Sequence, residues 1–244
     1  MQQDQALLFG DSITEQAFEP SVQGWGGYLT NAYARRLDVV QRGFSGYNTA
    51  HAVHMLPKIL KTITPAQSKL RFATIFFGAN DAATNVQAVP IAQYKENLTT
   101  LISQIRGNDP ATRILLLTPP PPHEGDWAAH CAEINSDPAR QASRTREYAD
   151  GCVEVARADK SGNVAVLNTW SVLLPPNGAY NAETVKPLLS DGLHFGQGAN
   201  SLLGPAVLEA IGREWPDLKA DNIKMNGPYW RDIDPADIPG SLFR

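Results

Sequence analysis

The chain has 244 residues, of which 43% are hydrophobic, and this is enough for a single domain with a full hydrophobic core. Its formal net charge of -4 and its scattered Lys and Arg residues exclude the basic surface that a nucleic-acid partner requires. No apolar run approaches the roughly 20 residues of a membrane span, and the N-terminal segment lacks the pattern of a signal peptide, so we expect a cytoplasmic protein.

Short apolar runs alternate with segments of helical periodicity along the chain. The runs predict strands over residues 6–9, 37–41, 72–77, 113–118 and 164–168. The segments between and after them predict helices over residues 26–37, 50–63, 91–107, 139–160 and 198–215. This alternation is typical of βαβ units, and it predicts a three-layer α/β/α sandwich of the flavodoxin-like kind around a five-stranded parallel sheet.

Two segments fall outside this alternation. Residues 118–127 contain a run of prolines, which predicts a stiff loop after the fourth strand. Residues 217–244 lose periodicity and gain Pro and Asp. We therefore predict one domain over residues 1–216, with residues 217–244 as an irregular extension of it.

The first predicted strand is followed by Gly10, Asp11 and Ser12, at the edge where parallel sheets bind their ligands. Alone, this turn is typical of a helix start that Asp or Ser caps. A nucleophilic serine needs an imidazole to take its proton and a carboxylate to orient the imidazole. Asp191 and His194, just before the last predicted helix, are candidates for both, although such a turn also occurs with a purely structural role.

Two further candidate positions follow the second and third predicted strands. Gly46 could offer a backbone N–H, and Asn80 a side-chain amide, to the oxyanion that forms during ester hydrolysis. The backbone N–H of Ser12 would complete a set of three donors, each worth roughly 3 to 4 kcal/mol in the transition state. The alternative is that both positions only form turns.

Six aromatic residues lie near these segments and could line an apolar pocket for an alcohol, although aromatic residues also build cores. They are Phe18, Trp25, Phe44, Tyr47, Trp127 and Phe195.

The other histidines and the two cysteines do not form a set of ligands at metal-binding spacing. They are His51, His54, His123, His130, Cys131 and Cys152. We therefore expect no metal and no cofactor.

Taken together, the four polar segments resemble the blocks of the SGNH or GDSL hydrolase family, in the family's order. The stretches "LLFGDSITE", "QRGFSGYNT", "IFFGANDA" and "SDGLHF", and "MNGPYWRDI" in the tail, are similar to its isoamyl acetate-hydrolysing esterase branch. The resemblance implies that Ser12 is the nucleophile, His194 the base and Asp191 its orienter. It also implies an oxyanion hole of Ser12, Gly46 and Asn80, and short-chain, acetyl-type esters of small alcohols as substrates.

Two places depart from the family pattern. Gln41 stands where many members carry an asparagine, which puts in doubt how the glycine-containing loop is held. Residues 125–141 have no clear counterpart, so the resemblance assigns no pocket residue there.

Other functions stay open at this point. A lysophospholipase or thioesterase, or a carbohydrate acetylesterase of the same family, would act on a different ester. A non-catalytic flavodoxin-like binding module would need neither His194 nor Asp191. The G-x-S-x-G elbow of the α/β-hydrolases is missed by one residue in "GFSGY". A small-molecule ester is the expected partner, and a homodimer is an open alternative to a monomer.

Overall fold

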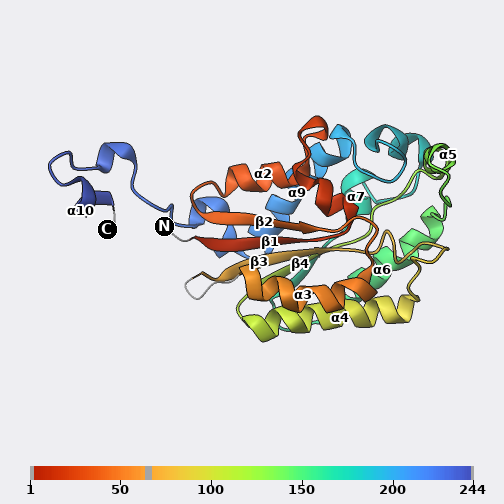
Figure 1. Ribbon diagram of the computed structural model, residues 1–244, viewed down its shortest axis with the longest axis horizontal. Helices are drawn as coiled ribbons and strands as arrows, with labels where there is room; N and C mark the ends of the chain where they lie inside the picture. Colours follow the sequence, from red (N-terminus) through yellow and green to blue (C-terminus); the bar gives the residue numbers. More distant parts are fainter. Residues whose placement is uncertain (1–2, 64–67, 243–244) are drawn as a thin grey trace.

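The computed structural model describes residues 3–63 and 68–242, and a five-stranded sheet lies at its centre (Figure 1). The strands are β1 (Asp4–Gly10), β2 (Leu37–Gly43), β3 (Leu70–Phe76), β4 (Arg113–Leu117) and β5 (Val164–Leu167). Their order in the sheet is β2-β1-β3-β4-β5, and all neighbours are parallel. The sequence therefore predicted the sheet and its strands correctly.

Helices cover both faces of this sheet, which makes the predicted three-layer sandwich (Figure 1). One layer contains α2 (Trp25–Ala32), α7 (Thr169–Leu173) and α9 (Gln197–Glu214), and the other contains α3 (Thr49–Ile63), α4 (Ile91–Asn108) and α6 (Ala142–Ala158). Shorter helices are α1 (Ser12–Glu15), α5 (Glu124–Glu133), α8 (Ala182–Val185) and α10 (Ile238–Leu242). Turns of 3₁₀ helix include η1 (Gln16–Phe18), η2 (Pro20–Val22), η3 (Lys186–Leu188), η4 (Pro216–Leu218), η5 (Ala220–Asn222) and η6 (Trp230–Asp232).

The inner strands β1, β3 and β4 are mostly apolar and buried on both faces, whereas the edge strands β2 and β5 are mostly half-buried. Successive side chains point to opposite faces. In β1, Ala6 and Leu8 pack with the layer of α2 and α9, and Leu7 and Phe9 pack with the layer of α3 and α4. All four side chains are fully buried. The two hydrophobic cores on either side hold the sheet rigidly, and the loops at the carboxyl ends of its strands are fixed with it.

Two predicted elements differ from the structure. The helix expected over residues 26–37 ends at Ala32, because Arg35 takes a left-handed conformation (φ 62°) that turns the chain into β2. The stiff loop expected over residues 118–127 ends earlier, since α5 begins at Glu124. His123 caps this helix, and its Nδ1 accepts a hydrogen bond from the Asp126 N–H at 3.1 Å. The proline run therefore leads directly into a helix.

The tail after α9 begins on the body of the molecule and then leaves it. Leu218 is buried, and the Arg35 guanidinium donates to the backbone carbonyls of Asn226, Gly227 and Pro228. Residues 229–242 extend away from the body, at the end of the molecule opposite to α5 (Figure 1). Among the residues that the structure describes, no helix combines the length and the apolar character that crossing a bilayer would demand.

Candidate active site

Ser12 lies at the turn from β1 into α1. Asp11 caps the helix, and its Oδ1 accepts a hydrogen bond from the Ile13 N–H at 3.0 Å. Gly10 is required before it, because a Cβ at this position would lie 2.1 Å from Thr14 Oγ1 and 2.6 Å from the Phe76 carbonyl oxygen. The tight turn places Ser12 at the edge of the sheet, where its side chain is 8% exposed. The backbone N–H of such a first helical residue has no partner within the helix.

Asp191 and His194 share one tight turn before α9. Asp191 Oδ1 accepts hydrogen bonds from the backbone N–H groups of Leu193 (2.9 Å) and His194 (2.8 Å). Gly192 has a φ of 92° in the same turn, and its carbonyl accepts from the His123 N–H at 2.8 Å. The Asp191 carboxylate therefore stabilises the turn from within, and the hydrogen bond from His123 connects the turn to the start of α5.

A continuous chain of hydrogen bonds joins this turn to Ser12. His194 Nδ1 lies 2.6 Å from Asp191 Oδ2, and His194 Nε2 lies 2.8 Å from Ser12 Oγ. Because an ionised carboxylate only accepts hydrogen bonds, Nδ1 carries the proton, and Nε2 of the neutral ring is left to accept from the serine hydroxyl. The structure brings together these three predicted residues across 182 positions of sequence.

Two carboxyl groups near the serine have shifted pKa values of opposite sign. Burial alone would raise the pKa of Asp191, but the hydrogen bond from the His194 ring, the electrostatic effect of that ring and two backbone N–H groups outweigh it and hold the pKa below its usual range. Asp191 is therefore ionised at neutral pH. Burial raises the pKa of Asp11 to about 7, despite the opposing effects of the Ile13 N–H and of His194.

Gly46 and Asn80 follow β2 and β3, the two neighbours of β1 in the sheet. Gly46 has a φ of 78°. Asn80 is 3% exposed, and its Nδ2 donates to the Tyr47 carbonyl at 2.8 Å. The loops after β2 and β3 are therefore joined to each other on the same edge of the sheet as Ser12.

Sequence reasoning missed two residues that hold these loops. Arg140 Nη2 donates to Asn80 Oδ1 at 2.7 Å and to Gln87 Oε1 at 2.8 Å, and Gln87 Nε2 donates to the Gly46 carbonyl at 2.9 Å. Arg140 lies in the stretch 125–141 that has no counterpart in the family pattern, so no motif pointed to it.

Gln41, which stands where many family members carry an asparagine, connects β2 to the turn that contains Ser12. Its Nε2 donates to the carbonyls of Thr14 (3.2 Å) and Glu15 (2.8 Å), at the end of α1. Nearby, the Ser45 N–H donates to Glu15 Oε2 at 2.6 Å. The glutamine therefore holds β2 against the serine-bearing turn, and Glu15 holds the loop that contains Gly46.

The structure places the six aromatic candidates in different surroundings. Trp25 and Phe195 belong to the hydrophobic core. Phe44 and Tyr47 stack on each other beside Gly46, with ring centroids 5.4 Å apart. Trp127 packs edge-on against the His194 ring, with ring centroids 6.1 Å apart.

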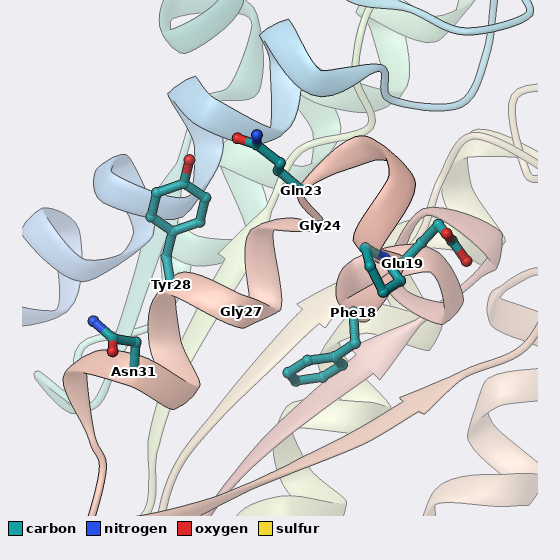
Figure 2. Close-up of a pocket in the computed structure, with 8 residues that line it drawn as sticks. Phe18, Glu19, Gln23, Gly24, Gly27, Tyr28 and Asn31 are labelled. Atoms are coloured by element: carbon teal, nitrogen blue, oxygen red, sulfur yellow. The ribbon is translucent and has the colours of Figure 1, made fainter.

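Phe18 lines a groove of about 390 Å³ next to α2 (Figure 2). The groove also borders Gln23, Gly27, Tyr28 and Asn31, and it contains none of the triad or oxyanion candidates. Its lining comes from α2 and from the turn before it.

The chain matches known proteins over most of its length. Residues 8–199 match the GDSL-like lipase/acylhydrolase family. The isoamyl acetate-hydrolyzing esterase 1 homolog of Mus musculus is 34% identical over 235 residues, which cover 94% of this chain and 88% of the mouse protein. The isoamyl acetate-hydrolyzing esterase of Saccharomyces cerevisiae is 32% identical over 245 residues and 96% of both chains.

Solved structures of low sequence identity share the fold. A GDSL-like lipase from Bacteroides thetaiotaomicron superposes with a TM-score of 0.62 at 16% identity, over 86% of this chain and 88% of the lipase. Esterase EstA from Pseudoalteromonas gives a TM-score of 0.58 at 16% identity, over 88% of this chain and all of EstA. Together with the sequence matches, this α/β/α sandwich identifies the chain as a member of the GDSL-like lipase/acylhydrolase family and as a carboxylic ester hydrolase.

Proposed function

We propose that the protein is a serine esterase that hydrolyses acetyl-type esters of small alcohols, with Ser12 as nucleophile, His194 as general base and Asp191 as the group that orients the histidine. The observation that carries the proposal is the chain of hydrogen bonds from Asp191 Oδ2 through His194 to Ser12 Oγ, at 2.6 Å and 2.8 Å. The 2.8 Å distance suits transfer of the Ser12 hydroxyl proton to His194 Nε2, and the 2.6 Å contact lets the ionised Asp191 orient the ring. The names of the mouse and yeast relatives support an acetate ester as substrate.

The reaction has two halves that use the same groups. Ser12 Oγ attacks the ester carbonyl while His194 Nε2 takes its proton, and a tetrahedral intermediate with a negatively charged oxygen forms. When this intermediate collapses, His194 returns the proton to the departing alcohol and the acyl group remains on Ser12. Water then attacks the acyl-enzyme with the same help from His194 and releases the acid.

The oxyanion is assigned to the N–H groups of Ser12, Gly46 and Asn80. These residues follow three adjacent strands, β1, β2 and β3, so their donors can converge on one point beside Ser12 Oγ. Asn80 offers a second N–H besides the one that bonds the Tyr47 carbonyl. Each donor that is aligned before the reaction lowers the barrier without further reorganisation.

A panel of esters tests the proposal. It varies the acyl chain from acetyl to palmitoyl and the leaving group among alkyl, aryl, sugar and thiol. We expect the highest kcat/KM for acetyl esters of alkyl alcohols, and complete loss of turnover in Ser12→Ala with the thermal unfolding unchanged. A preference for long acyl chains, thioesters or acetylated sugars would overturn the substrate assignment, and an active Ser12→Ala variant would overturn the nucleophile.

A further inference from the structure

The guanidinium of Arg140 joins the loop after β2 to the loop after β3. Its Nη2 donates to Asn80 Oδ1 at 2.7 Å and to Gln87 Oε1 at 2.8 Å, and its Nη1 donates to the carbonyl of Ala139 at 3.2 Å. The side chain is buried, and the guanidinium lies 5.9 Å from the centre of the Trp127 ring. Arg140 is thus fixed by packing as well as by hydrogen bonds.

Arg140 determines which way the Asn80 amide faces. A guanidinium only donates hydrogen bonds, so the amide oxygen must face Arg140 and the amide nitrogen must face the other side. There, one N–H bonds the Tyr47 carbonyl, and the second remains for another acceptor. A flipped amide would place NH₂ against the guanidinium and oxygen against the carbonyl, so both contacts would become repulsive.

Arg140 orients the Gln87 amide in the same way, and Gln87 in turn contacts Gly46. Its Oε1 faces Arg140, so its Nε2 must face away, and there it donates to the Gly46 carbonyl at 2.9 Å. The Gln87 backbone carbonyl is also held, by Asn48 Nδ2 at 2.9 Å. One guanidinium nitrogen thereby orients both loops whose N–H groups are assigned to the oxyanion.

The position of Arg140 carries a cost in stability. Within residues 3–63 and 68–242 its guanidinium forms no salt bridge, and its Nε–H has no hydrogen-bond partner. Burial lowers the pKa of Arg140, as expected when a charge is removed from water. Arginine is rarely buried without a paired charge, and such departures from the packing rules are expected mainly at functional sites.

We propose that Arg140 is a positioning residue of the oxyanion hole, which holds the Asn80 amide directly and the Gly46 peptide through Gln87 in the orientation that donates to the developing oxyanion. The inference rests on the proposed function, since it assigns a role toward that reaction. The positive charge of Arg140 also polarises the Asn80 amide, which makes its free N–H a stronger donor. Because this N–H gains most in the transition state, loss of Arg140 acts on kcat more than on KM.

The test is a double-mutant cycle of Arg140→Gln and Asn80→Ala, measured with an acetate ester. We expect Arg140→Gln alone to lower kcat by roughly tenfold or more, with a change in KM of less than about threefold. In the Asn80→Ala background its effect on kcat should be much smaller, because the direct contact with Asn80 is gone and only the link through Gln87 to Gly46 remains. An equal effect of Arg140→Gln in both backgrounds, or a wild-type kcat, would overturn the inference.

Two further variants protect the test against loss of folding. Arg146→Gln is the matched control, because Arg146 also lies over a tryptophan ring, that of Trp170 at 5.2 Å, and donates to a backbone carbonyl, that of Gly178. Its kcat should equal that of the wild type. Gln87→Leu breaks the link to Gly46 and removes one acceptor of Arg140 Nη2, but it keeps the Arg140–Asn80 hydrogen bond. We expect kcat to fall, and thermal unfolding shows that the variant is folded. If Gln87→Leu keeps full kcat, the Gly46 arm of the inference is wrong.

A Ser12→Ala variant separates this inference from the proposed function. If Ser12→Ala retains turnover, the proposed function fails whatever Arg140 does. If Ser12→Ala is inactive while Arg140→Gln matches Arg146→Gln, the esterase stands and only the role of Arg140 fails.

Discussion

At the scale of single residues, the two carboxylate oxygens of Asp191 make different contacts and have different roles. Oδ1 holds the turn by accepting from the N–H groups of Leu193 and His194, and Oδ2 faces His194 Nδ1. The first role needs only an acceptor, which an amide oxygen also supplies. The second needs a group that accepts from Nδ1, and this sets the tautomer of the ring.

Asp191→Asn therefore separates structure from catalysis. The amide oxygen can keep the two backbone hydrogen bonds, but its NH₂ then faces His194 Nδ1 and forces the ring proton onto Nε2. In that tautomer His194 cannot take the Ser12 proton, so we expect kcat to fall by about 10³ to 10⁴. Steady-state kinetics with an acetate ester, together with thermal unfolding, check this. A decrease of less than tenfold in a folded variant would contradict the role of Oδ2.

Asp11 makes the stability of the protein depend on pH. Its pKa is raised from 3.8 to about 7 by burial, so the folded state keeps a proton that the unfolded state releases between about pH 4 and pH 7. The stability due to this group is fully present below about pH 4 and is lost as the pH rises through about 7. His194 and Arg140 favour the ionised form and Asp81 opposes it, but burial outweighs these effects.

In Asp11→Asn this dependence disappears, because the amide does not titrate and can still cap α1 through its oxygen. We expect the variant to gain stability relative to the wild type between pH 4 and 7, by at most about 4 kcal/mol. Urea unfolding at about pH 5 and about pH 8 measures the difference. A constant difference between the two proteins would show that Asp11 does not keep its proton in the folded state.

At the scale of elements, the active turn depends on close contact with α5. A Cβ on Gly192 would lie 2.3 Å from the Trp127 backbone nitrogen and 2.7 Å from the His123 carbonyl oxygen. These are backbone atoms, so they cannot move aside as a flexible side chain does. The φ of 92° at Gly192 adds strain for any other residue.

We expect Gly192→Ala to lower the free energy of unfolding by about 1 to 3 kcal/mol and to lower kcat, because the turn with Asp191 and His194 must shift away from α5. Gly107→Ala in α4 is the control, since nothing lies within 4 Å of its Cβ. That variant should keep full activity and unfold at the same or a slightly higher temperature. Equal activity in both variants would show that α5 does not fix the turn.

The contact with α5 also marks the limit of what could be predicted from the sequence. The inner strands were predictable because their apolar runs are buried on both faces. Helix α5 was not, since it buries only Trp127 and Cys131 and thus gives little periodic signal after the prolines. The role of Arg140 could not be predicted for a different reason. Arginine is usually exposed at the protein surface, and Arg140 is separated from its partner Asn80 by 60 positions of sequence.

At the scale of the whole molecule, the contacts of the tail show how far along the chain the folded body extends. The sequence predicted a boundary at residue 216, where helical periodicity stops. In the structure, Leu218 is 1% exposed, and its carbonyl accepts a hydrogen bond from the buried Tyr33 hydroxyl at 2.9 Å. Arg35 then holds the carbonyls of residues 226–228. These contacts argue that the stabilising part of the chain reaches residue 228.

Two truncations test this reading by urea unfolding. Removal of residues 229–244 should change the free energy of unfolding by less than about 0.5 kcal/mol, because residues 229–242 extend away from the body (Figure 1). Removal of residues 217–244 should cost about 2 to 5 kcal/mol, because it takes Leu218 out of the core and leaves the Tyr33 hydroxyl buried without its acceptor. Equal stability of the two truncated proteins would favour the boundary at 216. A loss on removing only residues 229–244 would instead mean that the arm has a partner surface, and a halved mass in solution would identify that surface as a second copy of the chain.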